Sequence, residues 1–295
     1  MDDQLIWATD QEGQIRLIAA RTTDLVREAQ RRHNSWPTAT AALGRTMTAA
    51  LLIGAMQKGD EKITLRILGD GPLGAVVAQS NGQGQVRGYV QNPDLDWPSK
   101  SPEKLDVGGA VGSTGHLHVT RDLGLKESYT GSAPLVSGEI AEDLTHYFAT
   151  SEQTPSAVAL GVLVNEDGSV QAAGGYILQL LPGVSEERIE DIEKQIQALG
   201  PISHFFASGK DLADLVEPLL PGHEKKVLAV KKPAFYCHCD RERLTVMLKS
   251  LGAQELAQMR EEQGGAEVVC HFCSERFWFS AEDLTALERE VSGLE

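Results

Sequence analysis

The segment Cys237-His238-Cys239, followed after thirty residues by Cys270-His271-Phe272-Cys273, holds all four cysteines of the chain. Two short thiol pairs that meet in space form the tetrahedral arrangement that suits Zn²⁺, with each sulfur about 2.3 Å from the metal. Four thiolates fill every coordination position, whereas a hydrolytic zinc centre keeps one position open. We therefore expect one Zn²⁺ per chain at a site that is structural, redox-active or both. Its expected ligands are Cys237, Cys239, Cys270 and Cys273.

The residues around these cysteines predict a small module of helices and one hairpin. Residues 240–251 have an apolar helical face, and a second helix is expected to end at Gly264. Residues 267–279 predict a hairpin with the Cys270-x-x-Cys273 motif at its turn. Ser280 to Asp283 resembles a capping box, which predicts a last helix after it.

The length and composition of the chain predict more than one domain. With 295 residues, of which 41% are hydrophobic, it can form two buried cores. We expect an α+β domain over residues 1–182, a helical linker over 183–231 and a zinc domain over 232–295.

Residues 1–182 predict strand hairpins interspersed with helices, which is typical of an α+β domain rather than of βαβ alternation. The expected strands are 5–10, 15–22, 63–68, 75–78, 85–90, 157–164 and 170–181, with another beginning at 116, and the expected helices are 24–33, 37–57 and 139–148. Residues 69–74 match the glycine pattern of a dinucleotide-binding loop. Pro72 and a following strand favour a turn instead, because such a loop must open a helix.

Histidines are the other residues that could bind a metal. His116 and His118 share one face of a predicted strand, but no carboxylate or cysteine accompanies them, so we expect a polar strand face. His238 and His271 lie inside the thiol pairs, and four cysteines already saturate zinc.

Residues 91–114 predict a loop. Because residues 1–180 show no catalytic motif, we expect a protein that is not an enzyme.

Residues 183–231 predict two helices that could bind the first domain. Ser185 can cap a helix, and a second helix from Asp211 to Leu220 is expected to end at Pro221-Gly222. The first helix has an apolar stripe made of Ile189, Ile192, Ile196 and Leu199. The stripe fits two alternatives. The helices either pack permanently on the core, or detach and expose this stripe and the Phe205-Phe206 pair.

Charge and terminal sequence bear on partners and location. The net charge is −15, and residues 232–295 carry seven Lys and Arg against twelve Asp and Glu, which opposes nucleic-acid binding. Residues 1–4 lack the basic region of a signal peptide, and the apolar run 46–57 is too short to cross a membrane. We expect a cytoplasmic protein with reduced thiols and no membrane partner.

The sequence resembles the heat-shock protein 33 family of redox-regulated chaperonins over essentially its whole length. The segments that carry the resemblance are 235–243, Cys270 to Cys273, Val86 to Tyr89, 135–163 and Ala173 to Tyr176. The resemblance implies a holdase for unfolded client proteins, inactive when reduced and zinc-bound. It implies activation when oxidation removes zinc and unfolds the C-terminal part and linker, with no ATPase. We also expect self-association of the active form, as a homodimer.

Physical chemistry makes such a switch plausible. Zinc held by four thiolates contributes about 10–16 kcal/mol of folding free energy, and the 64 residues of 232–295 are too few for a strong core. Disulfides Cys237–Cys239 and Cys270–Cys273 would close tiny loops and let the module unfold, whereas bonds between the pairs would retain the crosslink. We therefore expect the two local disulfides.

Two other functions remain as alternatives. A thiol-disulfide oxidoreductase could use Cys270-x-x-Cys273, although that motif normally lies near the start of a βαβ fold. A zinc-ribbon nucleic-acid-binding protein is opposed by the acidic charge. Arg241, Arg243 and Arg276 are expected to offset the negative charge of the site and keep the thiolates ionised.

Overall fold

The computed structural model describes residues 1–59, 61–101, 104–124, 127–220 and 225–293. It divides into two compact units, Met1–Tyr236 and Cys237–Glu295. The predicted division into 1–182, 183–231 and 232–295 is a finer one and stays a prediction. None of the helices in the described ranges has the length and apolar character of a membrane span.

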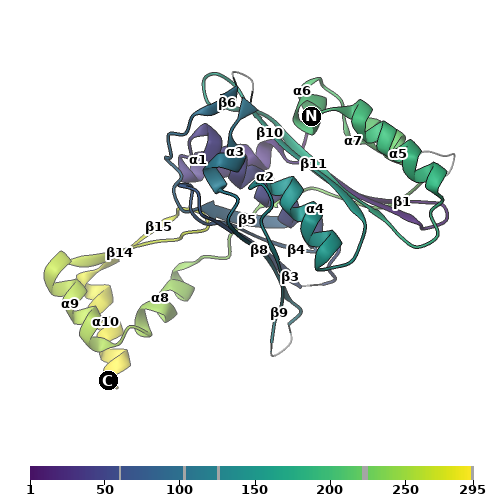
Figure 1. Cartoon of the computed structure of the whole chain (residues 1–295). Helices are drawn as coiled ribbons and strands as arrows, with labels where there is room; N and C mark the ends of the chain where they lie inside the picture. The colour runs from purple at the N-terminus through teal and green to yellow at the C-terminus, as the bar shows by residue number, and fades with distance from the viewer. Residues whose placement is uncertain (60, 102–103, 125–126, 221–224, 294–295) are drawn as a thin grey trace. The chain divides into compact units, whose positions relative to one another are not determined.

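Two antiparallel sheets form the framework of the first unit and confirm the α+β class (Figure 1). The five-stranded sheet has the order β10 (Ser156–Val164), β11 (Val170–Leu180), β2 (Ile15–Arg21), β1 (Gln4–Asp10) and β12 (Lys225–Lys231). The six-stranded sheet has the order β13 (Ala234–Phe235), β5 (Gln85–Val90), β4 (Val76–Asn81), β3 (Lys62–Gly69), β8 (Gly115–Asp122) and β9 (Tyr129–Pro134). Only the short β13 pairs in parallel within these sheets, with β5.

Helix α2 (Pro37–Gly54) lies between the two sheets and contacts strands of both. Pro37 occupies the first turn, where no backbone N–H is needed, and small Ala, Thr and Gly residues let the helix approach the strands closely. Nearly every residue of α2 is buried, as its sequence predicted. The helices α1 (Thr23–His33), α3 (Val107–Val111) and α4 (Ile140–Thr150) complete this core.

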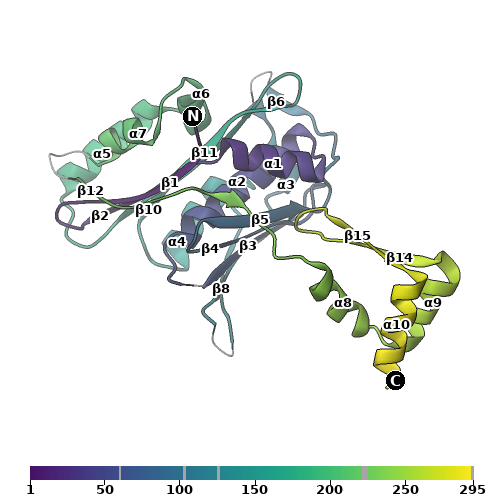
Figure 2. The same ribbon diagram turned by 180° about the vertical axis from the view of Figure 1, so that it is seen from behind.

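A second core covers the other face of the five-stranded sheet (Figure 2). It is formed by α5 (Glu186–Leu199), α6 (Ile202–Ala207) and α7 (Leu212–Leu219). Three of the four residues of the predicted stripe of α5 face this core, with Ile192 fully buried and Ile196 and Leu199 partly buried. Ile189 is partly buried but does not belong to this cluster. The linker helices are therefore docked in this structure.

Helix α6 rests directly on two glycines of the sheet. Gly161 of β10 and Gly174 of β11 pair across the strands, and both face α6. A Cβ built at Gly174 would lie 2.3 Å from Cε2 of Phe206, and one at Gly161 would lie 2.7 Å from the backbone nitrogen of Ser203. The absence of side chains at Gly161 and Gly174 leaves the space that α6 occupies. We call this glycine pair the glycine seat.

Several elements differ from the sequence predictions. Residues 91–114 are not a simple loop, because β6 (Ser99–Ser101), β7 (Lys104–Leu105) and α3 form there, and the Asp106 side chain caps α3 by accepting a hydrogen bond from Gly109 N–H. Strands β9 and β12 and helix α6 were not predicted. The expected turn is present over residues 70–74, between β3, which ends at Gly69, and β4. Pro221 and Gly222, expected to end α7, lie outside the described residues.

The second unit has a small core. It consists of α8 (Arg241–Lys249), α9 (Ala253–Gln263), the hairpin β14 (Gly265–Val269) and β15 (Arg276–Ser280), and α10 (Ala281–Ser292). The predicted capping box is present, since Ser280 and Asp283 bond each other's backbone N–H groups. The buried hydrophobic cluster comprises Leu248, Leu256, Ala266, Phe279, Leu284 and Leu287.

The glycine seat yields a prediction for Gly174→Ala. The added methyl would meet Phe206 and the carbonyl oxygen of Ala20, so we expect a loss of about 1–3 kcal/mol in unfolding free energy and faster amide exchange in residues 202–207. Hydrogen exchange with mass spectrometry measures both. Gln171→Ala, at an exposed position of the same strand, is the matched control. If amide exchange over residues 202–207 is unchanged in Gly174→Ala, α6 does not depend on the glycine seat.

Candidate metal centre

The four cysteines come from two segments of the second unit. Cys237 and Cys239 lie just before α8, and Cys270 and Cys273 lie in the turn between β14 and β15. This turn is tight, because Cys270 N–H donates to the carbonyl of Glu275 at 2.9 Å and the Ser274 N–H donates to that of Cys270 at 2.7 Å. Ser274 adopts a positive φ of 56° to close it. The hairpin thus fixes one thiol pair, while Asp240 caps α8 directly after the other.

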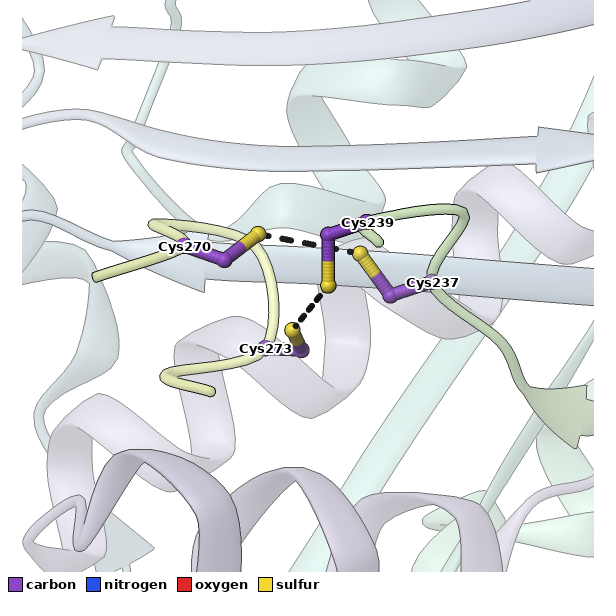
Figure 3. Close-up of side chains that lie close together, drawn as sticks. All are labelled: Cys237, Cys239, Cys270 and Cys273. Carbon is purple, nitrogen blue, oxygen red and sulfur yellow. Dashed lines mark hydrogen bonds between the residues drawn. The ribbon is translucent and has the colours of Figure 1, made fainter. Parts of the chain in front are cut away.

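The structure brings the four sulfurs together, as Figure 3 shows. All four Sγ atoms lie within 4.8 Å of one another. The closest approaches recorded join the two pairs, at 3.8 Å between Cys237 and Cys270 and 3.2 Å between Cys239 and Cys273. In the described part of the chain, no other group of three or more His, Cys, Asp or Glu side chains is arranged this way.

This arrangement can hold one metal ion. Sulfurs about 2.3 Å from a tetrahedral Zn²⁺ are about 3.8 Å from each other, close to the separations found here. Soft thiolate donors and four-fold coordination are compatible with zinc. Cys273 is buried and the other three are half-buried, so the group is shielded yet close to solvent.

The electrostatics of the sulfur group favour a bound cation. Burial raises the pKa of the Cys239 thiol far above its usual value, with further contributions from the neighbouring thiols. Burial is also the main cause that raises the pKa of Cys273 to about 11. Four thiolates would therefore repel one another in a partly desolvated site, and a divalent ion removes that cost by replacing the protons.

The expectation that nearby arginines keep the thiolates ionised is wrong, because carboxylates pair with them. Arg241 contacts Asp283 at 2.7 Å, Arg276 contacts Glu267 at 3.2 Å, and Arg243 lies 3.5 Å from the carboxylate of Asp240. Arg241 also lies over the ring of Phe279, 4.3 Å from its centroid. These arginines are paired with carboxylates, and the Cys239 and Cys273 thiols keep raised pKa values.

The histidines are not part of this group. His116 and His118 stack on one face of β8 with ring centroids 5.9 Å apart. Within the described residues, no third His, Cys, Asp or Glu side chain completes a ligand set with them. The sulfur group likewise includes neither His238 nor His271.

Comparisons with known proteins agree over the whole chain. The family model described as "Hsp33 protein" matches residues 3–280. The 33 kDa chaperonin of Desulforamulus reducens is 53% identical over 99% of this chain and 99% of that protein, and that of Bacillus subtilis is 47% identical over 98% and 99%. The crystal structure of the 33 kDa chaperonin of Thermotoga maritima superposes with a TM-score of 0.92, at 39% identity, covering 99% of this chain and 100% of that one.

Metal content tests the sulfur group directly. We expect the reduced protein to retain one zinc ion per chain after free metal is removed by gel filtration, and a Cys270→Ser, Cys273→Ser variant to retain none. Two hydroxyls cannot replace two thiolates as zinc ligands. A His238→Ser, His271→Ser variant, the matched control, should keep its zinc. Tight zinc in the double cysteine variant would refute the assignment.

Proposed function

The chain belongs to the Hsp33 protein family, and we propose that it is a redox-regulated holdase chaperone of the stress response. In this proposal the reduced, zinc-bound form is inactive. Oxidation releases zinc, unfolds residues 232–295 and the linker, and exposes a hydrophobic surface that binds unfolding proteins and prevents their aggregation. The observation that carries the proposal is the group of four sulfurs in a unit with a very small core.

Zinc provides much of the stability of the second unit. A four-thiolate site contributes about 10–16 kcal/mol to folding, comparable to the whole stability of an ordinary domain. Six buried hydrophobic residues cannot replace that contribution. Loss of the metal should therefore unfold the unit, whereas the larger cores of the first unit do not depend on it.

Oxidation converts the zinc ligands into disulfides. Each pair of thiols loses two protons and two electrons to an oxidant such as a peroxide, which is reduced to water, and the new sulfur–sulfur bond no longer provides a thiolate. All six sulfur pairings lie within 4.8 Å, so distance in the folded state does not select one. We propose Cys237–Cys239 and Cys270–Cys273, because these pairs stay adjacent when the unit unfolds.

Release of the linker helices would provide the client-binding surface. Helix α5 is held through Ile192 and its partly buried neighbours and through an ion pair of Arg188 with Asp10 at 3.0 Å, while most of its other positions face solvent. The chain then passes through β12 and β13 and reaches Cys237 after a single further residue, Tyr236. Unfolding that begins at Cys237 would remove an anchor for this segment. Detachment exposes two matching apolar faces, which favours client binding and formation of a homodimer.

The proposal includes a cytoplasmic location and no catalytic activity. A cytoplasmic location keeps the resting thiols reduced. A thiol-disulfide oxidoreductase is the weaker alternative, because Cys270 and Cys273 lie at the turn of a two-stranded sheet and not at the start of a βαβ unit. A nucleic-acid-binding protein is opposed by the net charge of −15.

Client aggregation tests the function. We expect oxidised protein to suppress the aggregation of a chemically unfolded client in light scattering, and reduced zinc-bound protein to leave it unchanged. Zinc release and peptide mapping of the disulfides are measured in the same sample. Suppression without zinc release, or mainly disulfides between the two pairs, would contradict the mechanism. Turnover of a small disulfide substrate would favour the oxidoreductase.

The role of the linker is tested by Ile192→Asp, Ile196→Asp. Charges on the buried face of α5 should weaken its docking while every cysteine remains intact, so this variant should suppress aggregation partly without oxidant. Gln195→Asp, Ala198→Asp adds the same charge at exposed positions of α5 and should stay inactive when reduced. If the first variant loses docking, keeps zinc and remains inactive, linker release is not the switch.

A further inference from the structure

Strand β12 is an open, apolar edge of the five-stranded sheet. It pairs with β1 on one side, and no strand among the described residues pairs with its other side. Val227, Leu228 and Val230 are 55%, 57% and 61% exposed. An exposed edge strand presents unpaired N–H and C=O groups to any extended chain, and its apolar side chains add affinity.

Positive charge surrounds this apolar edge. Residues 225–232 contain four lysines and no acidic residue, although the chain as a whole carries a net charge of −15. Lys225 pairs with Glu217, and Lys231 donates to the carbonyl of Gly82. Lys226 and Lys232 are exposed at opposite ends of the strand. A segment that pairs here should therefore be apolar in its centre and acidic at its ends.

A second copy of the same strand does not meet this requirement. Antiparallel pairing centred on Leu228 would place Lys225 of one chain opposite Lys231 of the other, and parallel pairing would place each lysine beside its own copy. Like charges opposite each other destabilise a sheet. The register shift at Trp7–Ala8, where Leu228 is the extra residue, also adds local twist that disfavours a flat dimer.

We propose that the outer edge of β12 binds an extended segment of an unfolding polypeptide by strand addition, and that it selects apolar segments flanked by Asp or Glu. Main-chain hydrogen bonds to β12 provide affinity, and Lys226 and Lys232 provide selectivity. This inference rests on the proposed chaperone function, for which it names a class of client segment. The edge exists only while the protein is folded, because β12 belongs to the linker that the proposed switch unfolds, and it is therefore distinct from the surface that linker release would expose.

Binding to this edge should be weak. One added strand of about seven residues must order a flexible peptide, so its affinity is small compared with that of a large hydrophobic surface. Weak capture by β12 is therefore compatible with an inactive reduced state. It would keep client segments near the protein until oxidation exposes the larger surface.

Fluorescence anisotropy with labelled peptides tests the edge in the reduced, zinc-saturated, full-length protein. The probes are EDVTVTVTDE, its charge-reversed form KKVTVTVTKK, and EDVTPTVTDE, in which proline disrupts strand pairing. We expect the acidic probe to bind most tightly, and the dissociation constants of the other two probes to be at least about fivefold larger. Hydrogen exchange should slow in residues 225–231 when the acidic probe is added. Equal binding of the acidic and basic probes, or protection confined to another segment, would overturn the proposal.

Two variants locate the interaction on β12. Val227→Thr, Val230→Thr keeps β-branched side chains at exposed positions but removes apolar contact, and should weaken the acidic probe about fivefold. The control Val136→Thr makes the same change at a valine that is 50% exposed elsewhere in the first unit, and should have no effect. Lys226→Glu should weaken the acidic probe and strengthen the basic one. Failure of this charge exchange would refute the role of the lysine.

This experiment separates the edge from the redox switch. It uses reduced protein only, so it does not depend on zinc release or on linker detachment. If oxidised protein suppresses client aggregation while the acidic probe fails to bind, the edge proposal is wrong and the chaperone function stands. If the probe protects β12 but oxidation never suppresses aggregation, β12 still binds peptide while the holdase function is refuted.

Discussion

The convergence of four sulfurs is the constraint on which the second unit depends. Two segments that are far apart in the sequence, at Cys237–Cys239 and Cys270–Cys273, must meet before a metal can be bound. The hydrophobic cluster around them is too small to hold the segments together alone. In the proposed function, folding of this unit and binding of its metal would be one event, so that chemistry at the sulfurs would act directly on the fold.

The first unit differs from the second in having a large hydrophobic core. Helix α2 is almost wholly buried between two sheets, so this core is stable without any ligand. The helices α5 to α7 form a separate layer on the outer face of one sheet, and α5 has a narrow apolar stripe with polar residues elsewhere. Because this layer has a core of its own, in which Phe205, Phe206 and Leu215 are at most 5% exposed, it can change as a unit without global unfolding.

The sequence predicted the grouping of the four cysteines and most of the elements because those signals are local. Cysteine spacing, the Ser280 capping box and the alternation of β10 and β11 are each contained in a few residues. Helix α6 has only six residues, too few for a clear period, and the bulge at Leu228 interrupts the alternation of β12. The partner of Arg241 could not be read locally, because Asp283 lies 42 residues away, whereas the carboxylate partners of Arg243 and Arg276 lie only three and nine residues away and were overlooked.

The glycine pair under α6 has a consequence for the recovery of the resting state. Gly161 and Gly174 form a recess in the sheet that accepts the ring of Phe206 and the backbone at Ser203. The next positions on the same face, Ala159 of β10 and Tyr176 of β11, carry side chains, so a helix displaced along the strands would meet them instead. The recess thus determines the position at which α6 packs on the sheet. In the proposed cycle, reduction and the return of zinc would be followed by docking of the linker, and the recess would admit a single register of α6.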